Sequence, residues 1–353
     1  MTAFRSYVIT RDAALTLDEK KQPEEKFLIL AFYYLVPVAN PAKLVQEFFE
    51  HFSGTDCKGR IYIAQQGINA TVSAPCSEAS RFMKWLATHP KLLSDQAWNA
   101  LEFKVEETEG HIFARLTVKQ KKELVALDKE ISFSERGEAI SPARWKKMME
   151  EEKDLLILDI RNDYEWELGH FEGARKPVCT TFRDFKEFAK NVALEIDPEH
   201  TKVMTYCTGG IRCEFFSSLL KENGIKNVYQ LDGGIIKYGI EEKSAHWLGK
   251  LFVFDDRLSA DISDRRAPPI GTCYHCHETA EKYYNCADMN CNTLFLCCPS
   301  CLEKYKGCCK EVCASASRLR PYKLSSTPFR RWYEYAKTKE ELDLLGSREQ
   351  GAS

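Results

Sequence analysis

Cys207-Thr208-Gly209-Gly210-Ile211-Arg212 is the stretch of the sequence that indicates both the fold and the chemistry. It follows Lys202–Tyr206, which has the pattern of a short buried strand, and precedes Phe215–Glu222, which has a helical pattern. On such a strand-to-helix turn, the N–H groups of the glycines and of the helix N-terminus converge on the cysteine. This field favours the thiolate, so we predict that Cys207 is reactive and lies in an anion-binding loop. A buried cysteine before an ordinary turn is the alternative.

The composition is that of a globular protein with more than one domain. At 353 residues, the chain is long enough for about two or three domains of ordinary size. Hydrophobic residues make up 44% and charged residues 29%, and the net charge of −2 excludes no class of partner. No apolar run is long enough to span a membrane, and Met1–Lys20 lacks the apolar region of a signal peptide. We therefore predict a cytoplasmic protein, whose 15 cysteines do not form structural disulfides because the cytosol is reducing.

An N-terminal α+β domain is predicted over residues 26–125, after an arm over residues 1–25 that has no clear period. Its apolar patterns follow the order β-α-β-β-α-β with one further strand, which is the ferredoxin-like split βαβ arrangement. The expected strands are 27–36, 59–64, 68–73, 101–106 and 112–118, and the expected helices are 41–52 and 77–88. Gln65, Gln66 and Asn69 lie around a predicted turn, where they either contact nucleic acid or serve the turn itself.

A second domain is predicted over residues 141–250, after a charged linker over 126–140. Helices alternate there with short apolar strands, which is typical of an α/β domain with a parallel sheet and a ligand site at the carboxyl ends of the strands. Asp159 and Arg161 end one such strand, where they either face the same crevice as Cys207 or form an ion pair that ties the sheet to a helix. Cys213 is expected to be a resolving thiol or a small core residue.

Four motifs of this second domain resemble those of a rhodanese domain. They are Asp159-Ile160-Arg161 with Glu165, Gly169-His170-Phe171-Glu172-Gly173-Ala174, the Cys207–Arg212 loop and Leu231-Asp232-Gly233-Gly234. The resemblance implies that Cys207 is the residue that would carry a persulfide. In this superfamily a loop of six residues, as here, suits sulfur, whereas phosphatase relatives use a longer loop that has room for phosphate.

The residues of the loop have separate predicted roles. Cys207 is the nucleophile. The backbone amides that would stabilise its anion belong to Thr208, Gly209, Gly210, Ile211 and Arg212. The Arg212 side chain would bind substrate or lower the pKa of the thiol.

A cysteine-rich metal-binding module is predicted over residues 251–313, because ten of the 15 cysteines lie between Cys273 and Cys313. Two Cys-x2-Cys knuckles supply four thiolates for a closed tetrahedral zinc site: Cys273, Cys276, Cys298 and Cys301. A second, interleaved site is predicted from Cys286, Cys291, Cys309 and Cys313, with Cys308 as an alternative to Cys309. Four protein ligands leave no open position, so we expect two structural zinc ions that supply much of the folding energy of the module. An iron–sulfur cluster is the alternative.

Residues 314–353 form a predicted basic and aromatic tail. Between Ala314 and Lys339 there are seven Lys or Arg and one Glu, interleaved with Tyr322, Phe329, Trp332, Tyr333 and Tyr335. Basic residues with aromatic rings suit phosphate contacts and base stacking. The alternative is a tail whose aromatic side chains pack on the preceding domain.

The whole arrangement of domains resembles the bacterial tRNA uridine hydroxylase family over about residues 27–320. The resemblance implies oxygen-dependent 5-hydroxylation of the wobble uridine in tRNA, with Cys207 essential and molecular oxygen as co-substrate. The sequence has no flavin or NAD fingerprint and no facial triad of two His and a carboxylate. The chemistry is therefore expected to pass through Cys207 or through a cofactor that has no motif here.

Two other functions remain open from the sequence. One is a sulfurtransferase that carries a persulfide on Cys207 and takes its sulfur from thiosulfate or a protein donor. The other is a non-catalytic, zinc-dependent RNA-binding module. The oligomeric state is left open.

Overall fold

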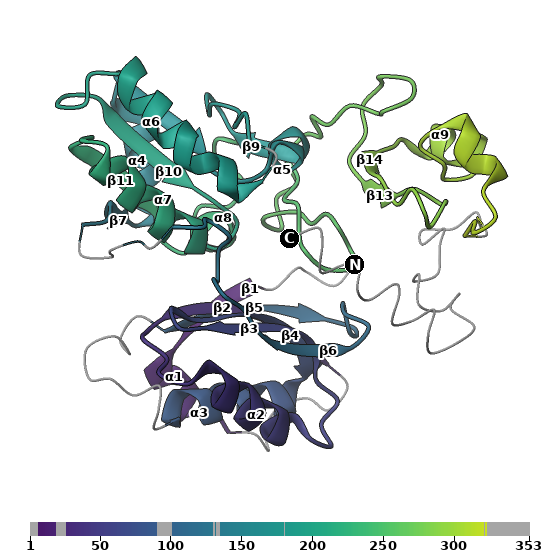
Figure 1. Ribbon diagram of the computed structural model, residues 1–353, viewed down its shortest axis with the longest axis horizontal. Coiled ribbons are helices and arrows are strands. Elements are labelled where there is room, and N and C mark those ends of the chain that lie inside the picture. Colours follow the sequence, from purple (N-terminus) through teal and green to yellow (C-terminus); the bar gives the residue numbers. More distant parts are fainter. Residues whose placement is uncertain are drawn as a thin grey trace.

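The computed structural model describes residues 6–18, 26–89, 101–129, 131, 135–179, 181–320 and 322. Within these residues the chain forms an N-terminal α+β domain, a second domain of the α/β class and a cysteine-rich module (Figure 1). The open face of the N-terminal sheet points towards the second domain, and the cysteine-rich module lies to one side of both. None of the helices within the described residues has the length and apolarity of a membrane span.

The N-terminal domain is a six-stranded sheet with helices on one face. Its strands, in the order β1-β5-β2-β4-β3-β6 across the sheet, are β1 (Ser6–Thr10), β5 (Glu102–Thr108), β2 (Phe27–Leu35), β4 (Gly67–Pro75), β3 (Lys58–Ala64) and β6 (Leu116–Gln120). Its helices are α1 (Arg11–Leu15), α2 (Pro41–Phe52) and α3 (Cys76–Thr88). The antiparallel order β5-β2-β4-β3 is the predicted ferredoxin-like arrangement, which is therefore confirmed.

The two faces of this sheet have different neighbours, because successive residues of a strand point to opposite sides. On β2, Leu30 and Phe32 are buried in the core with α2 and α3, and the Phe32 ring lies 5.9 Å from that of Phe82. The alternate residues Ile29, Ala31 and Tyr33 face the second domain. The sheet therefore buries one face against its own helices and places the other on a neighbouring domain.

Two parts of the N-terminal prediction differ from the structure. The predicted arm contains β1, which pairs with β5, and α1, which Thr10 caps through a bond from the Ala13 N–H. The strand predicted over 112–118 begins only at Leu116. Ile112 and Phe113 pack against Ile29 instead, and the Ile112 carbonyl accepts a bond from the N–H of residue 256. Strands β1 and β6 have only five residues each, which is too short for the alternation of apolar and polar residues to be recognised in the sequence.

The second domain has a parallel sheet in the order β7-β11-β10-β8, as predicted. Its strands are β7 (Glu138–Ile140), β8 (Leu155–Asp159), β10 (Lys202–Tyr206) and β11 (Asn227–Leu231). Its helices are α4 (Pro142–Glu151), α5 (Asp163–Leu168), a 3-10 turn η3 (Phe182–Asp184), α6 (Phe185–Glu195), α7 (Ile211–Glu222) and α8 (Gly234–Glu241). A small antiparallel pair joins β9 (Gly169–Phe171) to β12 (Trp247–Gly249).

The predicted linker belongs in large part to this second domain. Its last residues form β7, the edge strand that pairs with β11. Leu127 is buried in the core of the second domain, and so are Leu124 and Val125, the residues just before the predicted linker. The many charged residues of this segment made it resemble a linker, and its few apolar residues could be assigned to a core only from the structure.

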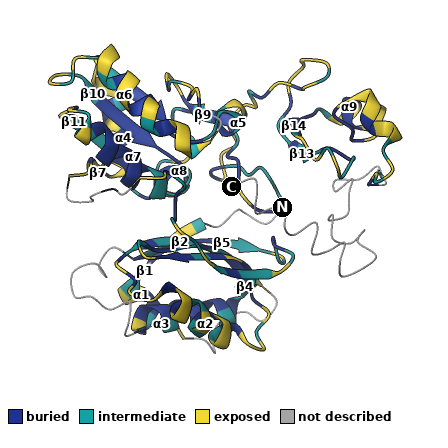
Figure 2. Cartoon of the chain, in the orientation of Figure 1, coloured by how far each residue is buried: buried dark blue, intermediate teal, exposed yellow. Residues whose placement is uncertain are grey.

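The cysteine-rich module contains little regular structure. It has β13 (Tyr283–Asn285) paired with β14 (Leu294–Leu296), helix α9 (Pro299–Lys304) and a 3-10 turn η4 (Glu311–Ser315). Buried residues alternate closely with exposed ones along its chain (Figure 2). Tyr283 anchors it to the second domain by donating from Oη to the Tyr164 carbonyl at 2.9 Å.

The first residues of the predicted tail pack against this module. Leu319 pairs with Asp288, and the buried Arg320 guanidinium donates to the carbonyls of Asn285 and Cys286. Phe329, Trp332, Tyr333 and Tyr335 lie outside the described residues, so the predicted RNA contacts of the tail stay a prediction.

Candidate active site and metal centres

The cysteine loop connects β10 to α7 at the carboxyl edge of the parallel sheet, as predicted. Cys207 has no exposed surface, and the Gly210 N–H donates to its Sγ at 3.2 Å. Gly210 has φ +104°, a conformation that residues other than glycine rarely adopt. The second glycine of the loop is therefore required for the backbone to turn back towards the sulfur.

Cys207 has a lowered pKa although it is completely buried. Burial alone would raise the pKa of this thiol. The Cys213 S–H, the Arg212 charge and the N–H groups of Cys213 and Gly210 outweigh burial and lower the pKa to about 6. At neutral pH Cys207 is thus a thiolate, which is the nucleophilic form.

Cys213 is a buried core residue, and its thiol also donates to Cys207. It has no exposed surface, and it lies in the core of the second domain. Burial and the Cys207 thiolate raise the pKa of Cys213, so it keeps its proton. Cys213 is thus a core residue whose thiol lies within hydrogen-bond reach of Cys207, and a role as resolving thiol stays a prediction.

Arg212 is held in a bidentate ion pair with Glu165. Its two terminal nitrogens lie 2.6 and 2.9 Å from the Glu165 carboxylate oxygens, and one also lies 3.1 Å from Thr208 Oγ1. Glu165 has no exposed surface, and burial alone would raise the pKa of its carboxyl group. The charge and hydrogen bonds of Arg212 outweigh burial and lower this pKa, so the carboxylate stays charged. Because Glu165 occupies the guanidinium fork, Arg212 acts on Cys207 through its charge. From the sequence, Glu165 stands out only as part of a motif, because its partner Arg212 is distant in the chain.

Asp159 and Arg161 form a buried ion pair beneath the loop. Both have no exposed surface, and Arg161 Nε lies 2.9 Å from Asp159 Oδ1. Asp159 also accepts a bond from Tyr206 Oη at 2.7 Å, and Arg161 donates to the Gly169 carbonyl at 2.6 Å. These contacts tie β8, β9 and β10 together. The predicted ion pair is therefore present, although it joins strands rather than a strand and a helix. Any contact of these two residues with a ligand stays a prediction.

The N-terminal sheet covers the cysteine loop directly, a contact that the sequence did not predict. Lys104 of β5 donates from Nζ to the Gly209 carbonyl at 3.1 Å. Tyr33 of β2 donates from Oη to the Glu214 carboxylate at 3.1 Å. The Tyr33 hydroxyl also lies close to Gly210, because a Cβ added to that glycine would be only 3.0 Å from Tyr33 Oη. Cys207 is thus enclosed by its own loop and by the neighbouring domain.

Gln65, Gln66 and Asn69 lie at and beside the β3–β4 turn, as predicted. The Gln66 side chain accepts a bond from the Leu124 N–H at 3.0 Å, and the carbonyls of Gln65 and Gln66 accept bonds from Val38 and Val36. The two glutamines therefore serve the fold, and their possible contact with nucleic acid stays untested.

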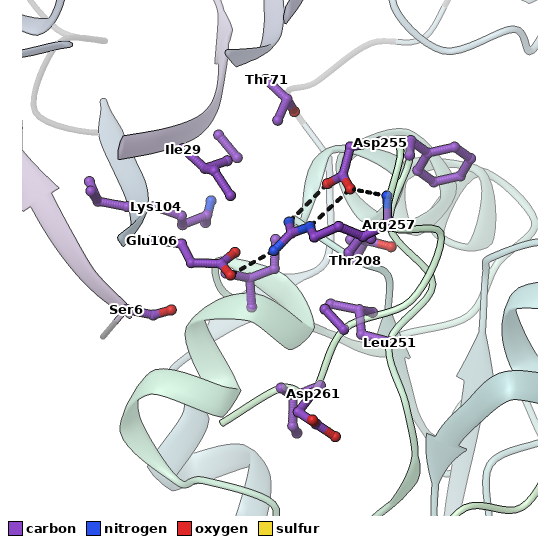
Figure 3. Close-up of a pocket in the computed structure, with 17 residues that line it drawn as sticks. Ser6, Ile29, Thr71, Lys104, Glu106, Thr208, Leu251, Asp255, Arg257 and Asp261 are labelled. Carbon is purple, nitrogen blue, oxygen red and sulfur yellow. Dashed lines mark hydrogen bonds and ion pairs between the residues drawn. The ribbon is translucent and has the colours of Figure 1, made fainter. Parts of the chain in front are cut away.

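A cavity with a volume of about 120 Å³ opens beside the loop (Figure 3). One wall is the open face of the N-terminal sheet, including Lys104 and Glu106, and the other comes from Thr208, α8 and residues 251–262. Arg257 crosses it, with 2.6 Å to Glu106 and 2.8 Å to Asp255. Cys207 is not among the lining residues, but Thr208, its neighbour in the chain, is.

Two groups of four cysteines in the C-terminal module could each hold a metal ion. They are Cys273, Cys276, Cys298 and Cys301, and Cys286, Cys291, Cys309 and Cys313, and the sulfur atoms of each group lie within 4.8 Å of one another. The separations between Cys276 and Cys298 and between Cys291 and Cys309 are 3.7 and 3.6 Å. A tetrahedron with metal–sulfur bonds of about 2.3 Å has edges of about 3.8 Å, so this geometry fits a tetrahedral metal.

The two cysteines outside these groups are neighbours of the candidate ligands. Cys308 lies beside the second group, and burial raises its pKa to about 11. Cys297 donates to the Cys298 carbonyl at 3.4 Å, and burial raises its pKa as well. Of the alternatives Cys308 and Cys309, the geometry selects Cys309.

The fold and the cysteine loop define the chain as a rhodanese-domain protein with two further modules. The model of the "Rhodanese-like domain" family matches residues 141–241, the "UPF0176 acylphosphatase like domain" matches 27–124, and "Rhodanase C-terminal" matches 248–314.

Curated relatives match nearly the whole chain. A protein of Protochlamydia amoebophila named tRNA uridine(34) hydroxylase is 48% identical over 89% of this chain and 97% of its own. Proteins with the same name from Chlamydia abortus and Chlamydia pneumoniae are each 45% identical, over 92% and 87% of this chain and 98% and 94% of their own. The chain belongs to the tRNA uridine(34) hydroxylase family.

The thiol donor at position 213 provides a test of how Cys207 is ionised. We expect Cys213→Ala to raise the pKa of Cys207 by about 1–2 pH units, because a hydrogen bond to a charged group contributes about 1.5–3 kcal/mol. The measurement is the rate of Cys207 alkylation by iodoacetamide as a function of pH, read by mass spectrometry of the peptide that contains Cys207. Cys213→Ser keeps a donor and should keep the midpoint near pH 6. A Cys213→Ala midpoint equal to that of the wild type would contradict this account.

Proposed function

We propose that this chain hydroxylates C5 of the wobble uridine in tRNA and that Cys207 is its nucleophile. The observation that carries the proposal is the near full-length similarity to relatives named tRNA uridine(34) hydroxylase, in a chain whose Cys207 is stabilised as a thiolate. The substrate is tRNA, which accords with the predicted cytoplasmic location.

Cys207 would act by adding to C6 of the uracil ring. The sulfur electron pair forms the S–C6 bond, and the electron pair of the C5=C6 double bond moves into an enolate that spans C5 and O4. C5 thereby becomes nucleophilic towards oxygen. The Gly210 N–H and the Arg212 charge keep Cys207 in the thiolate form that this addition needs.

The oxidation that follows uses dioxygen as the co-substrate. One oxygen atom forms the C5–O bond, and the other leaves as water after taking up two electrons and two protons from an external reductant. Loss of the C5 proton and departure of the Cys207 thiolate then restore the C5=C6 bond. The Asp159–Arg161 pair supports the loop from beneath in this scheme and does not touch substrate.

The four-cysteine groups are proposed to hold two structural zinc ions. All-thiolate tetrahedral sites are the preferred structural environment of Zn²⁺, and they leave no position open for substrate. N–H groups also point at the ligand sulfurs, as from Cys298 to Cys273 and from Cys309 to Cys286, both at 3.4 Å. The module has little regular structure, so bound metal would hold it together.

A persulfide-carrying sulfurtransferase is the second candidate. The observation that favours it is the buried thiolate in a six-residue loop, since a nest of N–H groups beside a positive charge would also stabilise a persulfide anion.

The hydroxylase proposal is tested by incubating the purified protein and a reductant with unmodified tRNA, in air and under nitrogen. We expect a gain of one oxygen atom on uridine in air only, measured by mass spectrometry of the nucleosides. Cys207→Ser should lower the rate by at least about 1,000-fold, because it replaces the nucleophile.

Each competing function has its own outcome in this assay. Absence of the oxygen-dependent product together with thiocyanate formation from thiosulfate and cyanide would replace the hydroxylase by the sulfurtransferase. Full activity of Cys207→Ser in cells would instead favour the non-catalytic RNA-binding module.

The zinc proposal predicts which cysteine substitutions remove metal. Cys273→Ser should reduce the content from about two zinc ions per chain to about one and make the module sensitive to proteolysis, because a ligand is lost. Cys297→Ser, a buried neighbour that is no ligand, should retain both. Metal content is measured by inductively coupled plasma mass spectrometry. Equal metal loss in the two variants, or iron in place of zinc, would contradict the proposal.

A further inference from the structure

We propose that the cavity between the N-terminal sheet and residues 251–262 binds the uracil ring of the substrate, and that Lys104 and Glu106 recognise its hydrogen-bonding edge. This inference rests on the proposed function and adds to it the site where the base is selected.

Lys104 and Glu106 face the cavity together because they are two residues apart on β5. Both line it, next to Ile29 and Ala31 of the paired strand β2 (Figure 3). Arg257 bonds to Glu106 Oε1 at 2.6 Å and holds that carboxylate in place. The polar groups of this wall are therefore fixed before a ligand arrives.

Lys104 has hydrogen-bonding capacity that its described contacts do not use. An ammonium group has three N–H donors, and the Lys104 ammonium gives one to the Gly209 carbonyl. Lys104 is only 6% exposed, and its ammonium otherwise lies 5.2 Å from the centre of the Tyr33 ring. Burial lowers the pKa of Lys104, and nearby acidic groups oppose this effect. A buried cation of this kind favours an acceptor oxygen as its ligand.

The lining of the cavity favours a neutral ring over a phosphate group. Much of the wall is apolar, and the Arg257 guanidinium is already paired with Glu106 and Asp255, so it is not available to neutralise a phosphate. An apolar cavity of about 150 Å³ is known to hold a benzene ring, so about 120 Å³ beside an opening suits one six-membered ring.

The edge of uracil matches the two polar groups. Uracil presents the O4 acceptor next to the N3–H donor, so Lys104 can donate to O4 while Glu106 Oε2 accepts from N3–H. Cytosine reverses both groups, with an amino donor at C4 and an acceptor at N3. It would place donor against donor and acceptor against acceptor, so the cavity discriminates against it.

The position of the cavity fits chemistry at Cys207. C6 lies across the ring from N3, so a ring held at N3–H by β5 presents C6 to the opposite wall. Thr208 belongs to that wall and directly follows Cys207. Cys207 has no exposed surface and does not line the cavity, so C6 reaches the sulfur only after the loop moves.

The test compares two tRNA transcripts that differ only in U34 or C34, and titrates uridine and cytidine monophosphate by calorimetry. The wild type should hydroxylate the U34 transcript and bind the uridine nucleotide more tightly. In Lys104→Gln and Glu106→Gln, both preferences should fall at least about tenfold, because a buried charged partner is lost. Lys26→Gln removes an exposed charge near β5 and should keep both preferences.

Each outcome decides one of the two claims. Unchanged preferences in Lys104→Gln and Glu106→Gln, in variants whose melting temperature matches the wild type, would overturn the assignment. The assignment would also be overturned if Lys104→Gln or Glu106→Gln shifted the pH midpoint of Cys207 alkylation but kept both preferences. That result would show that the residue acts on the cysteine loop and not on the base. If the wild type fails to hydroxylate but the nucleotide preference disappears in the variants, the proposed function falls and the cavity assignment stands.

Discussion

The stabilisation of a thiolate without exposed surface is the constraint on which the rest of the site depends. Burial opposes ionisation of Cys207, and only groups placed close to the sulfur can reverse that effect. Arg212 can be one of these groups because the buried Glu165 fixes and balances its charge. The Asp159–Arg161 pair in turn fastens the strands on which this arrangement rests. The Cys207 thiolate therefore depends on Arg212, and Arg212 depends on the buried carboxylate of Glu165.

The N-terminal domain is part of this site rather than an appendage. A ferredoxin-like sheet that covers one face with its own helices still has a second face to cover. Here that face lies on the cysteine loop through Lys104 and Tyr33, and it forms one wall of the adjacent cavity. Residues 251–262 complete the other wall, and Arg257 joins them to Glu106 of the sheet. The cavity thus depends on segments that lie far apart in the sequence.

Sequence reasoning succeeded where the physical signal is local. The cysteine loop is a single turn with two glycines, and the cysteines that could hold metal include pairs with characteristic spacings, so both could be located from the sequence. It failed where a residue acts through a distant partner. Nothing near Lys104 indicates the Gly209 carbonyl, and nothing near Glu165 indicates that it binds Arg212. Adjacent cysteines such as Cys308 and Cys309 could be separated only by the direction of their side chains, which spacing does not encode. Edge strand β7 was missed because three residues carry too little pattern.

The proposed chemistry depends on the addition of the Cys207 thiolate to C6 of the wobble uracil. Hydrogen exchange at C5 measures this step without the oxidation, because the enolate formed by addition takes up a proton from solvent at C5 before Cys207 leaves. The protein is incubated with tRNA in deuterium oxide under nitrogen, and the nucleosides are analysed by mass spectrometry. We expect deuterium at C5 of U34 with the wild type and none with Cys207→Ser. A wild-type protein that hydroxylates U34 in air but leaves its C5 hydrogen unexchanged under nitrogen would contradict it.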